Sequence, residues 1–243
     1  MRTLPLALLA RMIDSLLNFI FPVACILCGS QVLERRWGAA CLRCWESLRP
    51  VNAPICTKCG IPGIAIEGEC GRCRTGEHVF DFARSAVFFN DSAREIVHHL
   101  KYADRVSLAR PIGRMLREIL QREAFQGSQL IPVPLHRSRQ RERGFNQAEL
   151  IAGELGLPVD TRSIRRRKKT PTQTGLSRSE RARNLSAAFE LRGDVSGVKV
   201  ILVDDVFTTG ATMNELAKVF KRGGAARVEV LTFARVPDAI SPL

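Results

Sequence analysis

The stretch that decides the fold is Val200-Ile-Leu-Val-Asp-Asp-Val-Phe-Thr-Thr-Gly-Ala-Thr212. Its apolar first half predicts a buried strand, and the small residues that follow predict a tight turn into a helix. At such a turn the backbone N–H groups and the dipole of the helix favour an anion, and threonine hydroxyls add further donors. The predicted phosphate turn consists of Thr208, Thr209, Gly210, Ala211 and Thr212.

An acidic pair, Asp204 and Asp205, stands between this strand and the phosphate turn. Open α/β sheets bind ligands at the carboxyl ends of their strands, so the pair is expected to face the ligand. Two carboxylates beside a phosphate site can hold vicinal hydroxyls or support a positively charged reaction centre. A pair of this kind can also simply cap the next turn. The Gly-Lys-Ser/Thr signature of a Walker loop is absent from this stretch.

Strand and helix patterns alternate from residue 81 to the end of the chain. This alternation predicts a parallel sheet with flanking helices. The long polar stretch from 162 to 184 interrupts this alternation and is predicted to be a loop. Loops of this length in a compact domain are usually lids or disordered segments. Strands are expected at 83–89, 130–134, 199–203 and 227–234, and helices at about 91–102, 109–122, 146–155 and 213–222.

All eight cysteines lie between positions 25 and 73, in four Cys-x-x-Cys pairs. In a reducing cytoplasm each such pair is a bidentate metal ligand, and two pairs complete the tetrahedral coordination sphere of Zn²⁺. Iron–sulfur clusters use the same ligands, and a secreted chain would form disulfides instead. Zinc is the preferred prediction. The pairs are Cys25 and Cys28, Cys41 and Cys44, Cys56 and Cys59, and Cys70 and Cys73.

Two zinc ions are therefore expected, and their role is predicted to be structural. Four sulfur ligands leave no open position for water or substrate. A segment this short buries little core, so the metal would supply much of its folding free energy. The simplest arrangement is sequential, with the first four cysteines around one ion and the last four around the other. An interleaved arrangement stays open at this stage.

The first residues of the chain form an apolar run from 4 to 10 that Arg11 and Asp14 interrupt. The run is much shorter than the ~20 apolar residues of a membrane span. Apolar residues recur at helical spacing up to Ile20, so an amphipathic helix that docks on the protein or on a partner is expected. With no targeting signal found, a cytoplasmic location is predicted.

The chain is strongly basic, with 37 Lys and Arg against 24 Asp and Glu and a net charge of +13. Thirteen of the basic and five of the acidic residues lie between positions 134 and 183. A clustered positive field suits nucleic acid and also a small polyphosphate, although part of it can be a solvated face. The charge thus points to an anionic ligand without choosing between these classes.

The acidic pair and the phosphate turn closely resemble the binding motif for 5-phosphoribosyl 1-pyrophosphate (PRPP) of type I phosphoribosyltransferases. The whole chain resembles one branch of them, the ComF family, which is associated with bacterial competence and DNA uptake. The further motifs that carry the resemblance are Pro22 with the cysteine pairs, Leu100-Lys-Tyr102, Pro132-Val-Pro-Leu-His136, Arg143-Gly-Phe-Asn-Gln147, Thr170-Pro-Thr-Gln-Thr-Gly-Leu176 and Arg183-Asn184.

The resemblance implies a chain in three parts. These are an N-terminal amphipathic helix over residues 1–20, a double zinc ribbon over 21–78 and a phosphoribosyltransferase domain over 79–243. The fold class is then α/β, a type I phosphoribosyltransferase-like parallel sheet with flanking helices that follows a small zinc-ribbon module.

The resemblance also implies a reaction, the displacement of pyrophosphate from C1 of PRPP by a nucleophile. The phosphate turn would hold the 5′-phosphate. Asp204 and Asp205 would hold the ribose hydroxyls and stabilise the positive charge that develops on the sugar. Mg²⁺ would enter with the substrate, because it is the hard cation that suits phosphate oxygens.

Two further groups of site residues follow from the same comparison. An arginine-rich loop between 134 and 146 occupies the place of the pyrophosphate loop, and Lys101 adds another cation. Alternate arginines in this segment can also be a solvated surface. The polar stretch is expected to act as a flexible loop that closes over the site. The predicted pyrophosphate contacts are Lys101, Arg137, Arg141 and Arg143, and the predicted loop contacts are Thr170, Gln173 and Thr174.

Two functions remain open on the sequence. The first is an active PRPP-dependent transferase, whose acceptor cannot be identified because the acceptor pocket is built from scattered residues. The second is a nucleic-acid-binding accessory factor that uses its PRPP site for sensing or architecture. Single-stranded DNA and DNA-uptake proteins are the expected partners of either, and no membrane span is expected.

Overall fold

The computed structural model describes residues 20–63, 68–167 and 188–237. The predicted N-terminal amphipathic helix, apart from its last residue, lies outside this part of the chain. So do the predicted loop contacts Thr170, Gln173 and Thr174. Within the described ranges, no helix combines the length and the apolarity that crossing a membrane requires.

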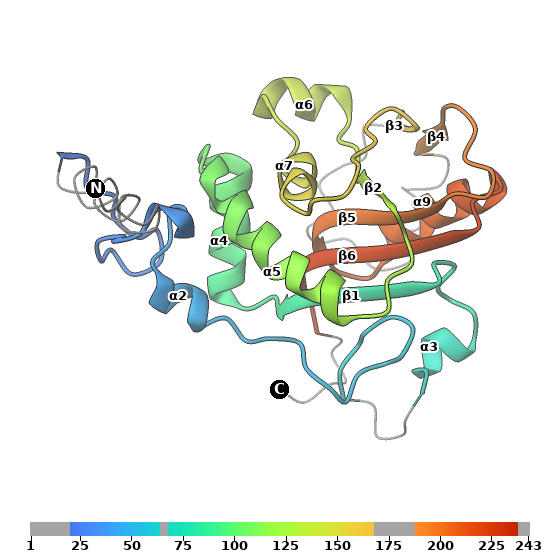
Figure 1. Cartoon of the computed structure of the whole chain (residues 1–243), viewed down its shortest axis with the longest axis horizontal. Helices are drawn as coiled ribbons and strands as arrows, with labels where there is room; N and C mark the ends of the chain where they lie inside the picture. Colours follow the sequence, from blue (N-terminus) through green and yellow to red (C-terminus); the bar gives the residue numbers. More distant parts are fainter. Residues whose placement is uncertain (1–19, 64–67, 168–187, 238–243) are drawn as a thin grey trace, which may run out of the picture.

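The centre of the molecule is a four-stranded parallel sheet in the order β1-β6-β5-β2 (Figure 1). The predicted alternation of strands and helices is therefore confirmed, since parallel neighbours require crossover connections. The apolar run before the acidic pair begins β5, which pairs with β6 on one side and β2 on the other. The strand continues through the acidic pair to Phe207, which corrects its predicted end at 203. The strands are β1 (Phe82–Phe88), β2 (Gln129–Pro132), β5 (Lys199–Phe207) and β6 (Arg227–Arg235).

Helices cover both faces of the sheet, as Figure 1 shows. Alternate residues of β5 point to opposite faces, so Ile201 packs with one group of helices and Leu202 with the α9 side. Both faces of the sheet at β5 are thus buried, which explains why the first half of the strand is continuously apolar. One face carries α4 (Asp91–Tyr102), α5 (Ala109–Arg122) and α7 (Gln147–Gly153), with the short η2 (Val106–Leu108), and the other carries α9 (Ala211–Arg222).

The arginine-rich segment after β2 is a helix, α6 (Arg137–Arg143), and the prediction of a loop there was wrong. His136 caps its first turn by accepting a hydrogen bond from the Ser138 backbone N–H at 3.2 Å. Gly144 ends it in the left-handed conformation at φ 79°, a common helix stop. Arginine has a high helix propensity, so these two caps suffice to make a short helix of the segment.

The polar stretch from 162 to 184 begins with a strand, which corrects its prediction as a loop throughout. β3 (Ile164–Arg166) pairs antiparallel with β4 (Phe189–Leu191) in a separate two-stranded sheet. Ile164 and Phe189 are both buried and pack with the cluster that includes the α9 side chains. Two isolated apolar residues in a polar context are a weak strand signal, and only their long-range packing makes them a strand.

The two cysteine-rich segments pack on opposite faces of the sheet. The first contains η1 (Arg35–Trp37) and α2 (Leu42–Glu46), and its Trp45 ring meets Phe233 of β6 edge to face, with 6.2 Å between centroids. The second contains α3 (Gly71–Arg74), and its cysteines Cys56, Cys59 and Cys73 pack with the α9 cluster. The cysteine-rich part is therefore joined to the sheet by two separate apolar contacts.

The chain from 49 to 58, which ends inside the second cysteine-rich segment, runs along the outer side of β1, an edge strand of the four-stranded sheet. The Val51 N–H donates to the carbonyl of Ala86 at 3.0 Å, and the Ala83 N–H donates to the carbonyl of Lys58 at 2.8 Å. These contacts satisfy β1 backbone groups that face away from β6.

Candidate functional site

A cavity of about 650 Å³ opens at the carboxyl ends of the parallel strands. Its walls include Phe89 just after β1, Val133 just after β2 and the acidic pair at the end of β5. Thr208 and Thr212, at the two ends of the phosphate turn, also line it. The structure therefore brings the predicted acidic and phosphate-binding groups together where ligands bind in open α/β sheets.

The two carboxylates of the acidic pair have different surroundings. Asp205 is buried, with 3% of its surface exposed, and forms an ion pair with Lys101 of α4. Asp204 is half-buried and accepts a hydrogen bond from the backbone N–H of Asp205 at 2.9 Å. Lys101, predicted as a pyrophosphate contact, thus lies in the cavity wall and forms an ion pair with one acidic residue.

These surroundings move the two pKa values in opposite directions. Burial, together with the adjacent charge of Asp205, raises the pKa of Asp204 well above its usual range. Burial also acts to raise the pKa of Asp205, but the charge of Lys101 and hydrogen bonds from Asp204 and Lys101 outweigh it, so the net pKa is lowered. The protonated form is therefore favoured at Asp204 and the ionised form at Asp205.

The phosphate turn owes its shape to Gly210, which caps α9 at φ 76°. The hydroxyl of Thr209 accepts a long hydrogen bond from the Ala211 N–H at 3.4 Å. Only glycine fits here, because a Cβ at Gly210 would lie 2.7 Å from Cζ of Phe207 and 3.2 Å from Cε1 of His78. The turn is therefore held between the end of β5 and the segment that follows the second cysteine group.

Replacement of Gly210 by Ala should lower the free energy of unfolding by roughly 1–3 kcal/mol, because the new side chain meets both strain and a ring. Thermal unfolding measures this loss. Gly153→Ala is the matched control, since a Cβ there meets no atom within 4 Å and the position is the last of helix α7. Equal melting temperatures for the two variants would show that the turn is not constrained as described.

The arginines of α6 divide between two sides of the helix. Arg139 and Arg143, four positions apart, line the cavity, and the Arg143 guanidinium lies over the Tyr102 ring at 5.0 Å. Arg137 and Arg141 are exposed and are not among the residues that line the cavity. Of the three α6 arginines predicted to bind pyrophosphate, the structure therefore brings only Arg143 to the acidic pair.

Two more arginines, which sequence reasoning did not assign to the site, also line the cavity. Arg94 comes from α4, and Arg166 comes from β3. Arg166 is buried over the Phe189 ring at 5.5 Å; burial lowers its pKa, as does Arg139, while Asp204 acts in the opposite direction. With these two, five cations from Lys and Arg surround two carboxylates, so the cavity suits a multiply charged anion.

Arg139 was also missed by sequence reasoning, although the sequence held a signal for it. Arg139 and Arg143 are spaced i and i+4, the spacing of one helix face, and become visible as a pair once α6 is recognised as a helix. No comparable local pattern marks Arg166, whose position depends on the pairing of β3 with β4.

The cysteines form two tetrads in sequential order, the first made by Cys25, Cys28, Cys41 and Cys44 and the second by Cys56, Cys59, Cys70 and Cys73. The Sγ atoms of Cys59 and Cys70 are 3.7 Å apart, as are those of Cys25 and Cys44. A tetrahedral ion with metal–sulfur bonds of ~2.3 Å needs ligand separations of ~3.8 Å. The residues thus fit one Zn²⁺ in each tetrad, and the sequential arrangement is confirmed.

Each tetrad also contains a thiol whose pKa is lowered, which favours the thiolate that binds metal. Hydrogen bonds from Ser30 lower the pKa of Cys28 to about 6. A hydrogen bond from Cys73, followed by the charge of Arg235, lowers the pKa of Cys59 to about 4 against the effect of burial. The second tetrad is therefore the more strongly tied to a charged residue of the sheet.

Two family models match the chain. A double zinc ribbon domain matches residues 16–74, and a phosphoribosyl transferase domain matches residues 107–242, more than half of the sequence. The first covers both tetrads and the second covers the acidic pair and the phosphate turn. The two halves of the observed architecture thus correspond to two known domain families.

Several relatives match nearly the whole chain. DNA utilization protein YhgH of Salmonella typhimurium is 35% identical over 88% of this chain and 97% of its own length. Competence protein F of Haemophilus influenzae is 31% identical over 90% and 100%, and competence protein ComFC of Bacillus subtilis is 27% identical over 89% and 96%. With its two cysteine tetrads ahead of a phosphoribosyltransferase-type sheet, the chain belongs to the ComF family.

Proposed function

We propose that the chain binds PRPP with Mg²⁺ and transfers its phosphoribosyl group to a nucleophile, in a pathway linked to DNA uptake or nucleotide metabolism. The observation that carries the proposal is the cavity at the ends of the strands. It combines an acidic pair, both ends of a phosphate turn and five cationic side chains. PRPP presents complementary groups, which are ribose hydroxyls, a 5′-phosphate and a pyrophosphate.

In the proposed reaction the bond between C1 and the pyrophosphate oxygen breaks, and pyrophosphate leaves with the electron pair. The acceptor then forms its bond to C1 and loses its proton to the surroundings. Asp204 and Asp205 would hold the ribose hydroxyls, and the negative charge of Asp205 would offset the positive charge on the sugar ring. Thr208 to Thr212 would hold the 5′-phosphate, and Lys101, Arg139 and Arg143 would offset the charge of the leaving pyrophosphate.

Mg²⁺ fits the donor set of the cavity, since carboxylate oxygens are the hard ligands that this ion prefers. When bound with the substrate it would supply charge neutralisation for the pyrophosphate. Zn²⁺ in the tetrads would have a structural role, because four sulfur ligands leave no open position. We also propose that the chain divides into three parts, residues 1–20, 21–78 and 79–243.

The direct test is the release of pyrophosphate from PRPP with a panel of bases and with single-stranded DNA as acceptors. Calorimetry on the zinc-loaded full chain measures PRPP affinity separately. Binding together with acceptor-dependent release supports the transferase. The absence of PRPP binding in the presence of Mg²⁺ would contradict the proposal, whatever the acceptor.

A second candidate function is supported by the names of the relatives and by the surface charge. One relative is named a DNA utilization protein and another a competence protein, and the exposed side of α6 carries Arg137 and Arg141. In this version the chain is a nucleic-acid-binding accessory factor, and PRPP in the cavity acts as a signal. Binding of PRPP without turnover with any acceptor would favour it.

The two sides of α6 allow DNA and PRPP binding to be tested separately. If the exposed side contacts a single strand, Arg137→Gln with Arg141→Gln should reduce the salt slope of DNA binding by about 1.4, because each phosphate contact contributes about 0.7. Arg139→Gln with Arg143→Gln should instead weaken PRPP binding. Fluorescence anisotropy across a salt series and calorimetry measure the two effects. Equal loss of PRPP affinity in both double variants would return Arg137 and Arg141 to the PRPP site.

A further inference from the structure

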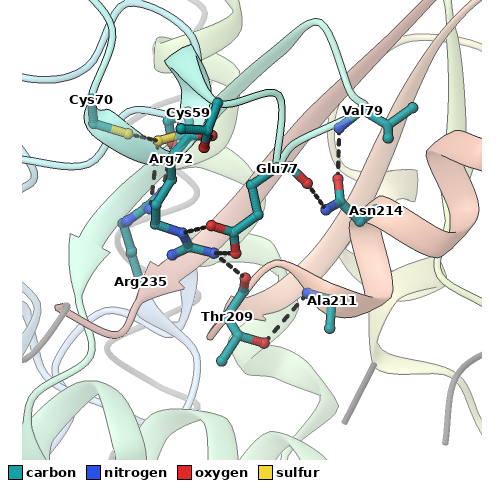
Figure 2. Close-up of polar contacts among 10 residues, drawn as sticks. Cys59, Cys70, Arg72, Glu77, Val79, Thr209, Ala211, Asn214 and Arg235 are labelled. Atoms are coloured by element: carbon teal, nitrogen blue, oxygen red, sulfur yellow. Dashed lines mark hydrogen bonds and ion pairs between the residues drawn. The ribbon is translucent and has the colours of Figure 1, made fainter. Parts of the chain in front are cut away.

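One residue of the second tetrad segment reaches directly to the phosphate turn. Arg72, which lies between the ligands Cys70 and Cys73, donates a hydrogen bond to the carbonyl of Thr209 at 3.0 Å (Figure 2). Its guanidinium is held in a fork by Glu77, with distances of 2.9 Å from Nε and 2.8 Å from Nη2. Bidentate pairing with a carboxylate fixes the orientation of a guanidinium, so Arg72 holds the carbonyl of Thr209 in a defined place.

A second contact joins the same two segments. Asn214, in the first turn of α9, donates through Nδ2 to the carbonyl of Glu77 at 2.6 Å and accepts at Oδ1 from the Val79 N–H at 2.8 Å. Figure 2 shows both bonds beside the Arg72 fork. The second tetrad segment therefore contacts the phosphate turn itself, through Thr209, and the helix just after it, through Asn214.

A third contact reaches the tetrad from the sheet itself. Arg235, at the end of β6, is 2% exposed and donates to the carbonyl of Cys59 at 2.6 Å. Its guanidinium also lies over the ring of Phe207, 4.4 Å from the centroid. A Cβ on Gly210 would meet this same Phe207 ring. The Arg235 side chain therefore contacts both the ligand Cys59 and the ring at the base of the turn.

The first tetrad provides an internal comparison. Arg43 occupies the same place between Cys41 and Cys44 that Arg72 occupies between Cys70 and Cys73. Arg43 is exposed, and its tetrad packs on the opposite face of the sheet with Trp45. The two tetrads therefore have like sequences but different relations to the cavity.

We infer that the second tetrad positions the phosphate turn, so that metal binding at Cys56, Cys59, Cys70 and Cys73 and PRPP binding strengthen each other through Arg72. The inference rests on the proposed binding of PRPP. Arg72 is a positioning residue, because it touches the turn backbone and not the ligand. Coupling between two sites is reciprocal, so PRPP must raise the affinity of this tetrad for metal by the factor by which metal raises PRPP affinity.

The test compares Arg72→Gln with Arg43→Gln in the zinc-loaded full chain. Arg72→Gln should lower PRPP affinity by about tenfold, within the range usual for coupled sites, and Arg43→Gln should leave it unchanged. A chromogenic chelator then reports zinc release. In the wild type and in Arg43→Gln, PRPP should slow one of the two release phases, and in Arg72→Gln it should slow neither. A merely structural role of Arg72 would not remove this protection.

Glu77→Gln serves as the second variant in case Arg72→Gln does not fold. Glu77 is partly exposed, and its loss of charge loosens the fork without removing a cysteine or the guanidinium. In Glu77→Gln, PRPP should still slow zinc release, but less than it does in the wild type. Equal PRPP affinity and equal zinc protection in Arg43→Gln and in the folded variants of Arg72 and Glu77 would overturn the inference.

Hydrogen exchange separates this inference from the proposed function. In the absence of any ligand, the amides of residues 209–214 should exchange faster in Arg72→Gln and in zinc-depleted protein than in Arg43→Gln. If the wild type binds no PRPP, the proposed function fails, and the exchange result alone decides whether the tetrad positions the turn. Equal exchange in the two arginine variants would then overturn the inference.

Discussion

Asp205→Asn should lower the rate of pyrophosphate release by about 100-fold or more, the usual effect of a lost electrostatic stabiliser. Asn keeps the size of the side chain and part of its hydrogen bonding but removes the charge that would face the sugar. PRPP affinity should fall much less, because the phosphate turn and Mg²⁺ remain. The substitution also leaves Lys101 without its counter-charge.

The same change at Asp204 should affect stability differently. Because the pKa of Asp204 is raised, its protonated form is favoured in the folded protein, and Asn resembles that form. An ionised Asp204 costs stability as the pH rises above the usual range of aspartate, so Asp204→Asn should be neutral or stabilising at neutral pH. Asp205→Asn should destabilise by ~1–2 kcal/mol, less than a fully buried pair because Lys101 is partly exposed.

Pyrophosphate release, PRPP calorimetry and thermal unfolding should be measured for both variants under the same conditions. Asp194→Asn is the matched control, since Asp194 lies in an exposed turn and accepts a hydrogen bond from the Ser196 N–H that Asn can also accept. Turnover and affinity equal to the control in both variants would remove the acidic pair from the site.

Removal of metal should have the largest effect on stability. Structural zinc contributes an apparent free energy of ~10–16 kcal/mol in small zinc domains at pH 7. This is comparable to the ~5–15 kcal/mol by which whole domains are stable, so chelation should abolish the folding of both tetrad segments. Because the second tetrad contacts the sheet through Arg235, its loss should also lower the melting temperature of the sheet.

Elemental analysis should find two zinc ions per chain, and thiol titration of the folded protein should find no reactive cysteine. Cys28→Ser and Cys73→Ser separate the tetrads, since Cys28 is exposed and Cys73 is buried against the α9 cluster. The Cys73 variant should melt at the lower temperature. Four disulfides by mass spectrometry would contradict the zinc assignment, and strong visible absorption would indicate iron.

The elements that sequence analysis predicted well are those with a strong local pattern. Helix α5 was predicted with its observed bounds of 109 and 122, and β5 was identified from its continuous apolar run. The acidic pair and the phosphate turn were found because their groups are adjacent in sequence. The part boundaries, the flexible-loop contacts and the cytoplasmic location stay predictions.

The remainder of the site depends on contacts between distant segments. Arg166 reaches the cavity only because β3 pairs with β4, and Arg72 meets Thr209 across 137 positions of sequence. The side chain of Lys101 was expected on pyrophosphate, but its ion pair with Asp205 needs α4 to cross the end of β5. Local patterns carry no record of such pairings, since tertiary packing decides them.

The chain that runs beside β1 has a consequence for behaviour in solution. An uncovered outermost strand offers a row of backbone donors and acceptors to other molecules, and this is a common route to aggregation. Here the cover is the connector from 49 to 58, and both of its ends are anchored by cysteine tetrads. The protein should therefore self-associate as it loses zinc, and the zinc ions would maintain solubility as well as the fold.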